Sequence, residues 1–239
     1  MAFGIYDEQR NFIIPHPEVR LPVLLIVESA ICAAWDLLRN SPRAGFDLLT
    51  AKEDEVTLEL HEALCDRVFK MGIVEGFDAK IFSLPEREPK IRNYDRTRPD
   101  KMPDLMVRLL GRPAGIKNTQ DGLFIECKPL DSKHPVRMHY LDKGLARFIR
   151  GDYAWAMTVA MMLGYAKEGY AIAAKLIPAL TNWPEGTALT VTARPCAHSK
   201  AGAASEAVHT TEHTRGFRYL ETRRGAPPIT IRHLWLRRD

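Results

Sequence analysis

The chain has 239 residues, which is long enough to bury a sizeable core, and its 46% apolar and 27% charged residues are those of an ordinary soluble globular protein. Its charge is mildly basic, with 34 Lys and Arg against 30 Asp and Glu, which identifies no partner by itself. From residue 188 onward, nine basic residues stand against four acidic ones. This asymmetry is typical either of a surface that meets polyanions or of a solvated basic tail.

The cysteines and the most apolar segment argue against export and against a membrane span. The four cysteines lie far apart with no CxxC pair, which is typical of reduced cytosolic thiols. Residues 21–35, "LPVLLIVESAICAAW", are shorter than a bilayer span and contain Glu28, and the acidic start "GIYDEQR" is unlike a signal peptide. We therefore expect a buried helix there and a cytoplasmic protein with no membrane partner.

The first part of the chain is expected to form an arm and two helices. Residues 1–20 carry two prolines around His16, which is typical of an extended or turning arm. A helix is expected over about 22–40. A second helix is expected to begin at Thr50, a candidate N-cap with Glu53 three residues later as in a capping box, and to end at Gly72.

The remaining elements give a mixed α/β fold with a central β-sheet flanked by helices. After a mixed segment at 73–103, strands are expected at 104–110, 122–128, 169–177, 188–195 and 228–237, with a long helix at 139–166. A mobile loop rich in His, Ala and Gly is expected between the last two strands. Residues 1–50 are expected to pack on a core of residues 51–180, with a C-terminal β extension at 181–239 belonging to the same domain.

Two of these strands carry charged residues at one end. Asp104 precedes the apolar run "LMVRLL", and the next strand ends in Glu126-Cys127-Lys128. Alternation along a strand places Glu126 and Lys128 on one face and Cys127 on the other. Paired carboxylates suit Mg²⁺ or Mn²⁺, and a lysine beside such a site can position or help deprotonate water or neutralise charge on a phosphate. The arrangement therefore suits phosphodiester hydrolysis.

This pattern of Pro103-Asp104, a strand, about twenty residues and a strand ending in "ECK" resembles the PD-(D/E)XK nuclease superfamily. The resemblance covers roughly residues 51–177 and implies a restriction endonuclease-like core of αβββαβ order, with an extra N-terminal helix and C-terminal strands. It implies that Asp104 and Glu126 bind metal and that Lys128 is the catalytic lysine. The alternative is an accidental pair of charged strand ends.

The family often adds a glutamate from the preceding helix. Here Glu55, Glu59 and Glu62 lie along one helical edge, and we expect Glu55, in the first turn, to complete the metal site and assist catalysis. Acidic residues in a first turn also suit the helix dipole and a solvated face, so this alternative stays open.

The helix after the "ECK" strand offers a basic stripe. Lys143, Arg147 and Arg150 are spaced to share one face, with Tyr140 and Tyr153 near the two ends. The stripe is expected to bind substrate phosphates, or else it is a solvated helix face. In the related nucleases this helix often lies beside the active site, sometimes with a Gln or Tyr facing it.

The histidine-rich tail allows two interpretations. We expect His213 and Arg215 to belong to a basic surface that binds nucleic acid or a partner protein. Zinc binding by Cys196, His198, His209 and His213 is the weaker alternative, because their spacing matches no zinc motif.

The sequence thus predicts a Mg²⁺- or Mn²⁺-dependent deoxyribonuclease. No ATP-binding loop, helix-turn-helix or zinc finger is recognisable in the sequence. Either the core itself recognises DNA, alone or as a homo-oligomer, or a targeting or ATPase subunit brings it there, as for an effector subunit of a restriction or anti-phage defence system. The alternative from another class is a non-catalytic nucleic-acid or protein interaction module that retains the fold.

Overall fold

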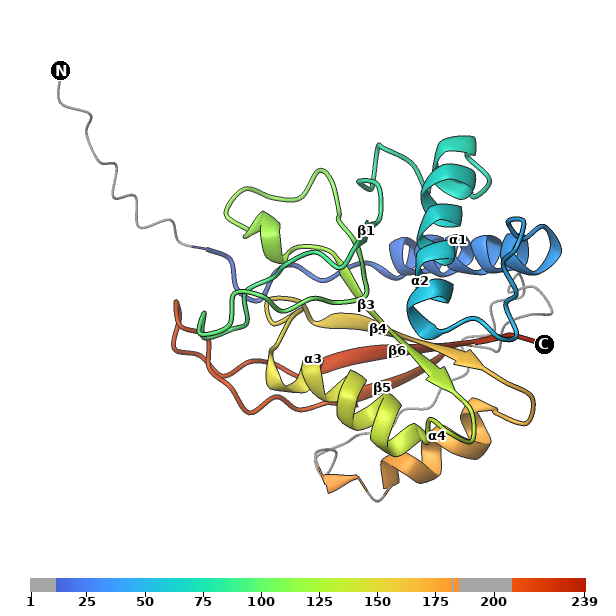
Figure 1. Ribbon diagram of the computed structural model, residues 1–239. Helices are drawn as coiled ribbons and strands as arrows, with labels where there is room; N and C mark the ends of the chain where they lie inside the picture. Colours follow the sequence, from blue (N-terminus) through green and yellow to red (C-terminus); the bar gives the residue numbers. More distant parts are fainter. Residues whose placement is uncertain (1–11, 182, 185–207) are drawn as a thin grey trace.

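The computed structural model describes residues 12–181, 183–184 and 208–239 (Figure 1). Its helical segments are α1 (Leu21–Asn40), α2 (Glu53–Glu62), the π-type helix η1 (Ala63–Phe69), the 3-10 turn η2 (Asn118–Gln120), the π-type helix η3 (Val136–Leu145), α3 (Ala146–Arg150) and α4 (Ile172–Thr181). Its strands are β1 (Glu86–Arg87), β2 (Leu105–Val107), β3 (Leu123–Leu130), β4 (Val159–Ala166), β5 (His209–His213) and β6 (Ile229–Arg237).

The described strands form one mixed sheet in the order β1-β2-β3-β4-β6-β5. Strands β1, β2 and β3 pair antiparallel, β3, β4 and β6 run parallel, and β5 returns antiparallel on the edge of β6. The parallel step from β3 to β4 crosses over through η3 and α3. Every residue of β3 and β4 is buried, as expected for parallel strands covered on both faces.

Helices cover both faces of this sheet (Figure 1). On one face, Trp35 of α1 stacks on Tyr165 of β4 with ring centroids 5.4 Å apart. On the other, Tyr140 of η3 meets the edge of Trp235 of β6 at 5.7 Å. The larger of two clusters of buried apolar side chains in the described residues runs from Val19 to Leu236. The predicted α/β class, with a mixed central sheet and flanking helices, is therefore confirmed.

Among the described residues, α1 is the helix that is long and apolar enough, by length and composition only, to cross a membrane. Half of its most apolar window is buried inside the protein, and core helices of soluble proteins pass the same test. Its Glu28 forms a buried ion pair with Arg232 of β6. This pair fixes α1 against the sheet.

Two predicted elements after β3 are wrong in type. The long helix expected at 139–166 ends at Gly151, whose left-handed φ of +75° terminates α3, and its last part is strand β4. A strand buried on both faces has no polar and apolar alternation to distinguish it from a buried helix. Residues 169–177, expected to be a strand, belong largely to α4, whose apolar face repeats at helical spacing.

Of the other predicted elements, some are confirmed, one is shorter than predicted and one differs in type. The helix expected at 22–40 is confirmed as α1, and the strands expected near 122–128 and 228–237 are β3 and β6. The strand expected at 104–110 is shorter, since β2 ends at Val107. The "HTTEH" segment, expected to be a loop, is strand β5. The strand expected at 188–195, with Cys196, His198 and most of the predicted mobile loop, lies outside the described residues.

Candidate active site

Asp104 lies beside the "ECK" end of β3 because of the register between β2 and β3. The two strands pair antiparallel with Leu105 opposite Ile125, and their pairing ends there. Asp104 immediately precedes β2, and its Oδ2 accepts a hydrogen bond of 2.6 Å from the backbone nitrogen of Cys127. The carboxylate thus supplies the partner that the β3 backbone lacks beyond the end of β2.

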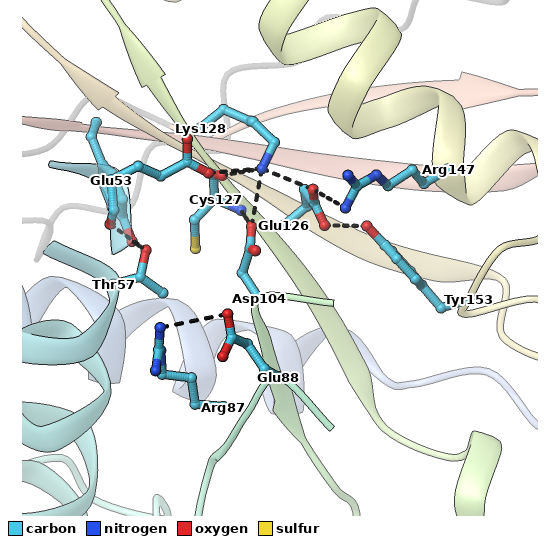
Figure 2. Close-up of polar contacts among 11 residues, drawn as sticks. Glu53, Thr57, Arg87, Glu88, Asp104, Glu126, Cys127, Lys128, Arg147 and Tyr153 are labelled. Atoms are coloured by element: carbon cyan, nitrogen blue, oxygen red, sulfur yellow. Dashed lines mark hydrogen bonds and ion pairs between the residues drawn. The ribbon is translucent and has the colours of Figure 1, made fainter. Parts of the chain in front are cut away.

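Four oxygen atoms surround the ammonium group of Lys128 (Figure 2). The Nζ atom lies 2.9 Å from Glu53 Oε1, 3.2 Å from Asp104 Oδ2 and 2.9 Å from Glu126 Oε1. It also donates a hydrogen bond of 2.6 Å to the carbonyl oxygen of Cys127. The side chains of this acidic cluster come from α2, from the residue before β2 and from β3, so the packing of α2 against these two strands assembles it.

Glu126 is held from the side opposite Glu53 by two further residues (Figure 2). Arg147 Nη1 lies 2.9 Å from Glu126 Oε1, and the Tyr153 hydroxyl donates a short hydrogen bond to Oε2. Arg147 comes from α3, and Tyr153 follows the turn at Gly151 that ends this helix. The Glu126 side chain is completely buried, so its two oxygens depend on these partners and on Lys128.

Burial and crowding of charge shift the pKa values of the cluster. Burial, together with the nearby charge of Asp104, raises the pKa of Glu126 to about 7. Burial also raises the pKa of Glu53. Burial alone would lower the pKa of Lys128, but the three surrounding carboxylates together raise it above its ordinary value. The lysine is therefore a cation at neutral pH.

The glutamate of α2 that joins the cluster is Glu53. The structure therefore places a different glutamate beside Lys128 than the predicted Glu55. Helix α2 begins two residues later than the predicted capping box requires, with Lys52 instead of Thr50 as its N-cap. Glu55 Oε2 accepts a hydrogen bond of 2.8 Å from the Lys52 backbone nitrogen, which turns it away from the cluster. Glu59 instead pairs with Arg43. Glu53, as the first helical residue, is left to reach Lys128.

The predicted basic stripe is divided between the cluster and the surface. Lys143 and Arg150 are exposed on η3 and α3, whereas Arg147 is engaged by Glu126. Tyr153 lies in the cluster, while Tyr140 is buried and contacts His233 Nδ1 at 3.1 Å through its hydroxyl. Arg147 is thus a partner of the acidic cluster and not a free phosphate ligand.

The prediction that His213 and Arg215 form a basic surface is contradicted by their burial. His213 is only 1% exposed and bonds the Thr211 hydroxyl, and Arg215 is 6% exposed. The Arg215 guanidinium donates to the carbonyl oxygens of Trp155 and Pro227. Side chains alternate in direction along β5 and the extended chain after it, and this alternation turns both residues inward. Both residues therefore hold the C-terminal segment against the core.

The oxygen atoms around Lys128 are those that a hard cation prefers. Three carboxylates and one backbone carbonyl fit Mg²⁺ or Mn²⁺, which bind oxygen ligands and retain waters. As the side chains are arranged, the lysine ammonium takes the central position, and no group of three or more His, Cys, Asp or Glu in the described part of the chain holds a metal as it stands.

Comparisons of the chain with models of protein families, with curated proteins and with solved structures found no match. What the acidic cluster does is therefore inferred from its own chemistry.

Proposed function

We propose that this protein is a divalent-metal-dependent nuclease that hydrolyses phosphodiester bonds of DNA. Glu53, Asp104 and Glu126 are the proposed metal-binding residues, and Lys128 is the proposed catalytic lysine. The observation that carries the proposal is the convergence of these three carboxylates on one buried ammonium group, from three separate elements (Figure 2).

The charges in the cluster favour the binding of a cation. Three carboxylates face the two cations Lys128 and Arg147, so fully ionised side chains leave one negative charge over. Buried charge without compensation is costly, and the pKa of Glu126 is raised first by burial and then by the charge of Asp104. A divalent cation would offset that charge. When bound, it would polarise a phosphoryl oxygen and lower the pKa of a water.

Lys128 is suited to stabilise negative charge. It is held as a cation by its neighbours, and its Nζ already donates to the Cys127 carbonyl and to carboxylates. An ammonium in that state orients an attacking water through hydrogen bonds and neutralises charge that builds up on the phosphate. It has no free lone pair with which to remove a proton.

Arg147 and Tyr153 position Glu126. Each binds a different oxygen of this carboxylate, which fixes the plane of the group and the direction of its lone pairs. A metal ligand fixed in this way keeps its geometry through the reaction.

The order of elements also supports the proposal. From α2 to β4 the chain runs helix, three strands, helix, strand, which is the αβββαβ order that the PD-(D/E)XK resemblance implies. Asp104 immediately precedes the second strand of that series, and Glu126 and Lys128 lie within the third. The finer assignment to a restriction endonuclease-like core is part of this proposal.

Cleavage of plasmid DNA with Mg²⁺ tests the proposal. We expect the protein to cleave, EDTA to abolish cleavage, and Asp104→Ala and Lys128→Ala each to lower the rate by about 100-fold or more. Lys80→Ala, at an exposed lysine outside both the cluster and the predicted basic stripe, is the control and should change the rate only a few-fold. Parallel assays with single-stranded DNA and RNA define the substrate. Cleavage that survives both cluster substitutions would contradict the assignment.

One observation favours the alternative of a non-catalytic interaction module: Lys128 already occupies the centre of the oxygen atoms. Isothermal titration with Mn²⁺ separates the two functions. Binding of Mn²⁺ that is lost in Asp104→Ala supports the nuclease. An absence of Mn²⁺ binding, with nucleic-acid binding unchanged by Glu126→Gln, supports the module.

A further inference from the structure

A basic cavity adjoins the acidic cluster at the carboxyl ends of the parallel strands. It has a volume of about 310 Å³, and its wall includes Lys52, Lys133, Lys167 and Arg238. Glu53, which contacts Lys128 in the cluster, belongs to the same wall. The two sites therefore share a residue.

The sheet itself brings two of these cations together. Strands β3, β4 and β6 run parallel and in register, with Leu130, Ala166 and Arg237 side by side at their ends. One residue further, Lys167 N donates to the Leu130 carbonyl at 3.0 Å, and Arg238 N donates to the Ala166 carbonyl at 2.9 Å. In open α/β sheets, the crevice outside the carboxyl ends of the strands is where ligands bind.

The cations of the cavity are not balanced by the acids beside them. None of the four forms an ion pair with an acidic residue in the part of the chain that the structure describes. The two acids of the wall are engaged elsewhere. Glu53 binds Lys128, and Asp131 accepts hydrogen bonds from the His134 ring at 2.8 Å and from the Lys133 backbone at 2.9 Å. The cavity thus presents an excess of positive charge.

One of the cations is fixed in place. Arg238 is 6% exposed, and its Nη2 donates to the Ala51 carbonyl at 2.7 Å while Nε donates to the Leu48 carbonyl at 2.7 Å. Carbonyl oxygens hold the guanidinium in place, and the charges of Asp131 and Asp47 oppose the lowering of its pKa by burial. The exposed lysines Lys52, Lys133 and Lys167 surround it on flexible stems.

We propose that this cavity binds a phosphate group of the nucleic-acid strand on which the acidic cluster acts. The inference rests on the proposed function, because it takes the substrate to be a nucleic acid. Lys and Arg without acidic partners bind phosphate through charge-assisted hydrogen bonds, and such contacts fix the register of a strand without reading its sequence. The phosphate is either an internal diester or a terminal monoester, and both offer anionic non-bridging oxygen atoms.

The test measures binding without cleavage. Fluorescence anisotropy in EDTA follows the binding of labelled single-stranded DNA to the full chain in three forms: linear with a 5′-phosphate, linear with a 5′-hydroxyl, and circular. The test variant is Lys133→Ala/Lys167→Ala. The matched control is Lys70→Ala/Lys80→Ala, which removes two exposed lysines outside the cavity.

We expect the cavity variant to weaken binding about tenfold at 0.1 M salt and to reduce the slope of log K against log salt by about one, while the control changes affinity less than threefold. An equal loss on the circular strand identifies an internal diester, and a loss confined to the 5′-phosphorylated strand identifies a terminal monoester. Equal losses in the two variants, or no binding by the unaltered protein, would overturn the inference. If the unaltered protein cleaves DNA but the cavity variant binds DNA normally, the cavity proposal is wrong and the nuclease proposal stands. If the unaltered protein does not cleave DNA but the cavity variant binds it more weakly, only the nuclease proposal is wrong.

Discussion

At the scale of single residues, the candidate site depends on how one buried carboxylate is held. Glu126 is completely buried, and each of its oxygens has a hydrogen-bond donor: Lys128 and Arg147 on Oε1, and Tyr153 on Oε2. Burial raises the pKa of Tyr153 well above its ordinary value, and the charge of Glu126 adds to this. Tyr153 therefore stays protonated and donates, so it is part of the cluster although it lies outside the sequence motif.

Tyr153→Phe tests this coupling. Removing the hydroxyl leaves a buried carboxylate oxygen without its donor, which should lower the free energy of unfolding by about 1 to 3 kcal/mol in urea titrations. In a Glu126→Gln background the same substitution should lower the free energy of unfolding by clearly less. An identical cost in both backgrounds would show that Tyr153 acts by packing and not through Glu126.

The motif residues were predictable because local rules place them. Strand alternation puts Glu126 and Lys128 on one face, and a hairpin brings Asp104 opposite them. Glu53 was not predictable in place of Glu55, because the choice depends on Lys52 rather than Thr50 being the N-cap of α2. Thr50 was expected to cap the helix, but its hydroxyl bonds Asp47 instead.

At the scale of elements, α1 is fixed to the sheet by a buried ion pair and an aromatic stack. Glu28 pairs with Arg232 of β6, and Trp35 stacks on Tyr165 of β4. These contacts join the expected N-terminal extension to the strands that end at the basic cavity. The sequence predicted α1 correctly from its apolar run, but its partner strand lies about 200 residues away and leaves no local signal.

Breaking this pair on one side should be much more harmful than removing it. Glu28→Met leaves the Arg232 guanidinium buried without its carboxylate and should cost about 3 to 5 kcal/mol in the free energy of unfolding. Glu28→Met/Arg232→Met should recover most of that loss. A double variant less stable than Glu28→Met alone, measured by urea unfolding, would contradict this account.

At the scale of the whole molecule, the C-terminal segment completes the fold through a buried polar chain. The Tyr140 hydroxyl contacts His233 Nδ1 at 3.1 Å, His233 Nε2 lies 2.8 Å from the Thr211 hydroxyl, and this hydroxyl lies 2.6 Å from His213 Nε2. It links η3, β5 and β6 on one face of the sheet. The sequence predicted a basic surface at His213 and Arg215 because charged residues are usually exposed. The packing of the C-terminal segment buries both residues instead.

The two buried histidines should make the protein sensitive to acid. Burial lowers the pKa of His213 to about 3 and places that of His233 well below its ordinary value. In the unfolded chain the two histidines bind protons near pH 6.5. The free energy of unfolding is therefore highest above that pH and falls as the pH drops toward the pKa values of the folded protein. The loss approaches about 1.4 kcal/mol per pH unit for each histidine.

Urea unfolding at pH 7.5 and 5.5 measures this effect. The unaltered protein should lose stability between the two values, and His213→Gln should lose less. His61→Gln, at a half-buried histidine on α2 that contacts the Pro85 carbonyl and neither of these histidines, is the control and should behave like the unaltered protein. A pH dependence that His213→Gln leaves unchanged would show that this histidine is not responsible.

The claim that the acidic cluster is a catalytic centre is tested most directly by two neighbouring glutamates on one helix. Mg²⁺-dependent cleavage of plasmid DNA is measured for Glu53→Gln and Glu55→Gln, which make the same chemical change two residues apart. Glu53 contacts Lys128 in the cluster, whereas Glu55 only caps α2. We predict that Glu53→Gln lowers the rate by about 100-fold and that Glu55→Gln stays within about threefold of the unaltered protein. Equal rates for the two variants, or a larger loss in Glu55→Gln, would contradict the account.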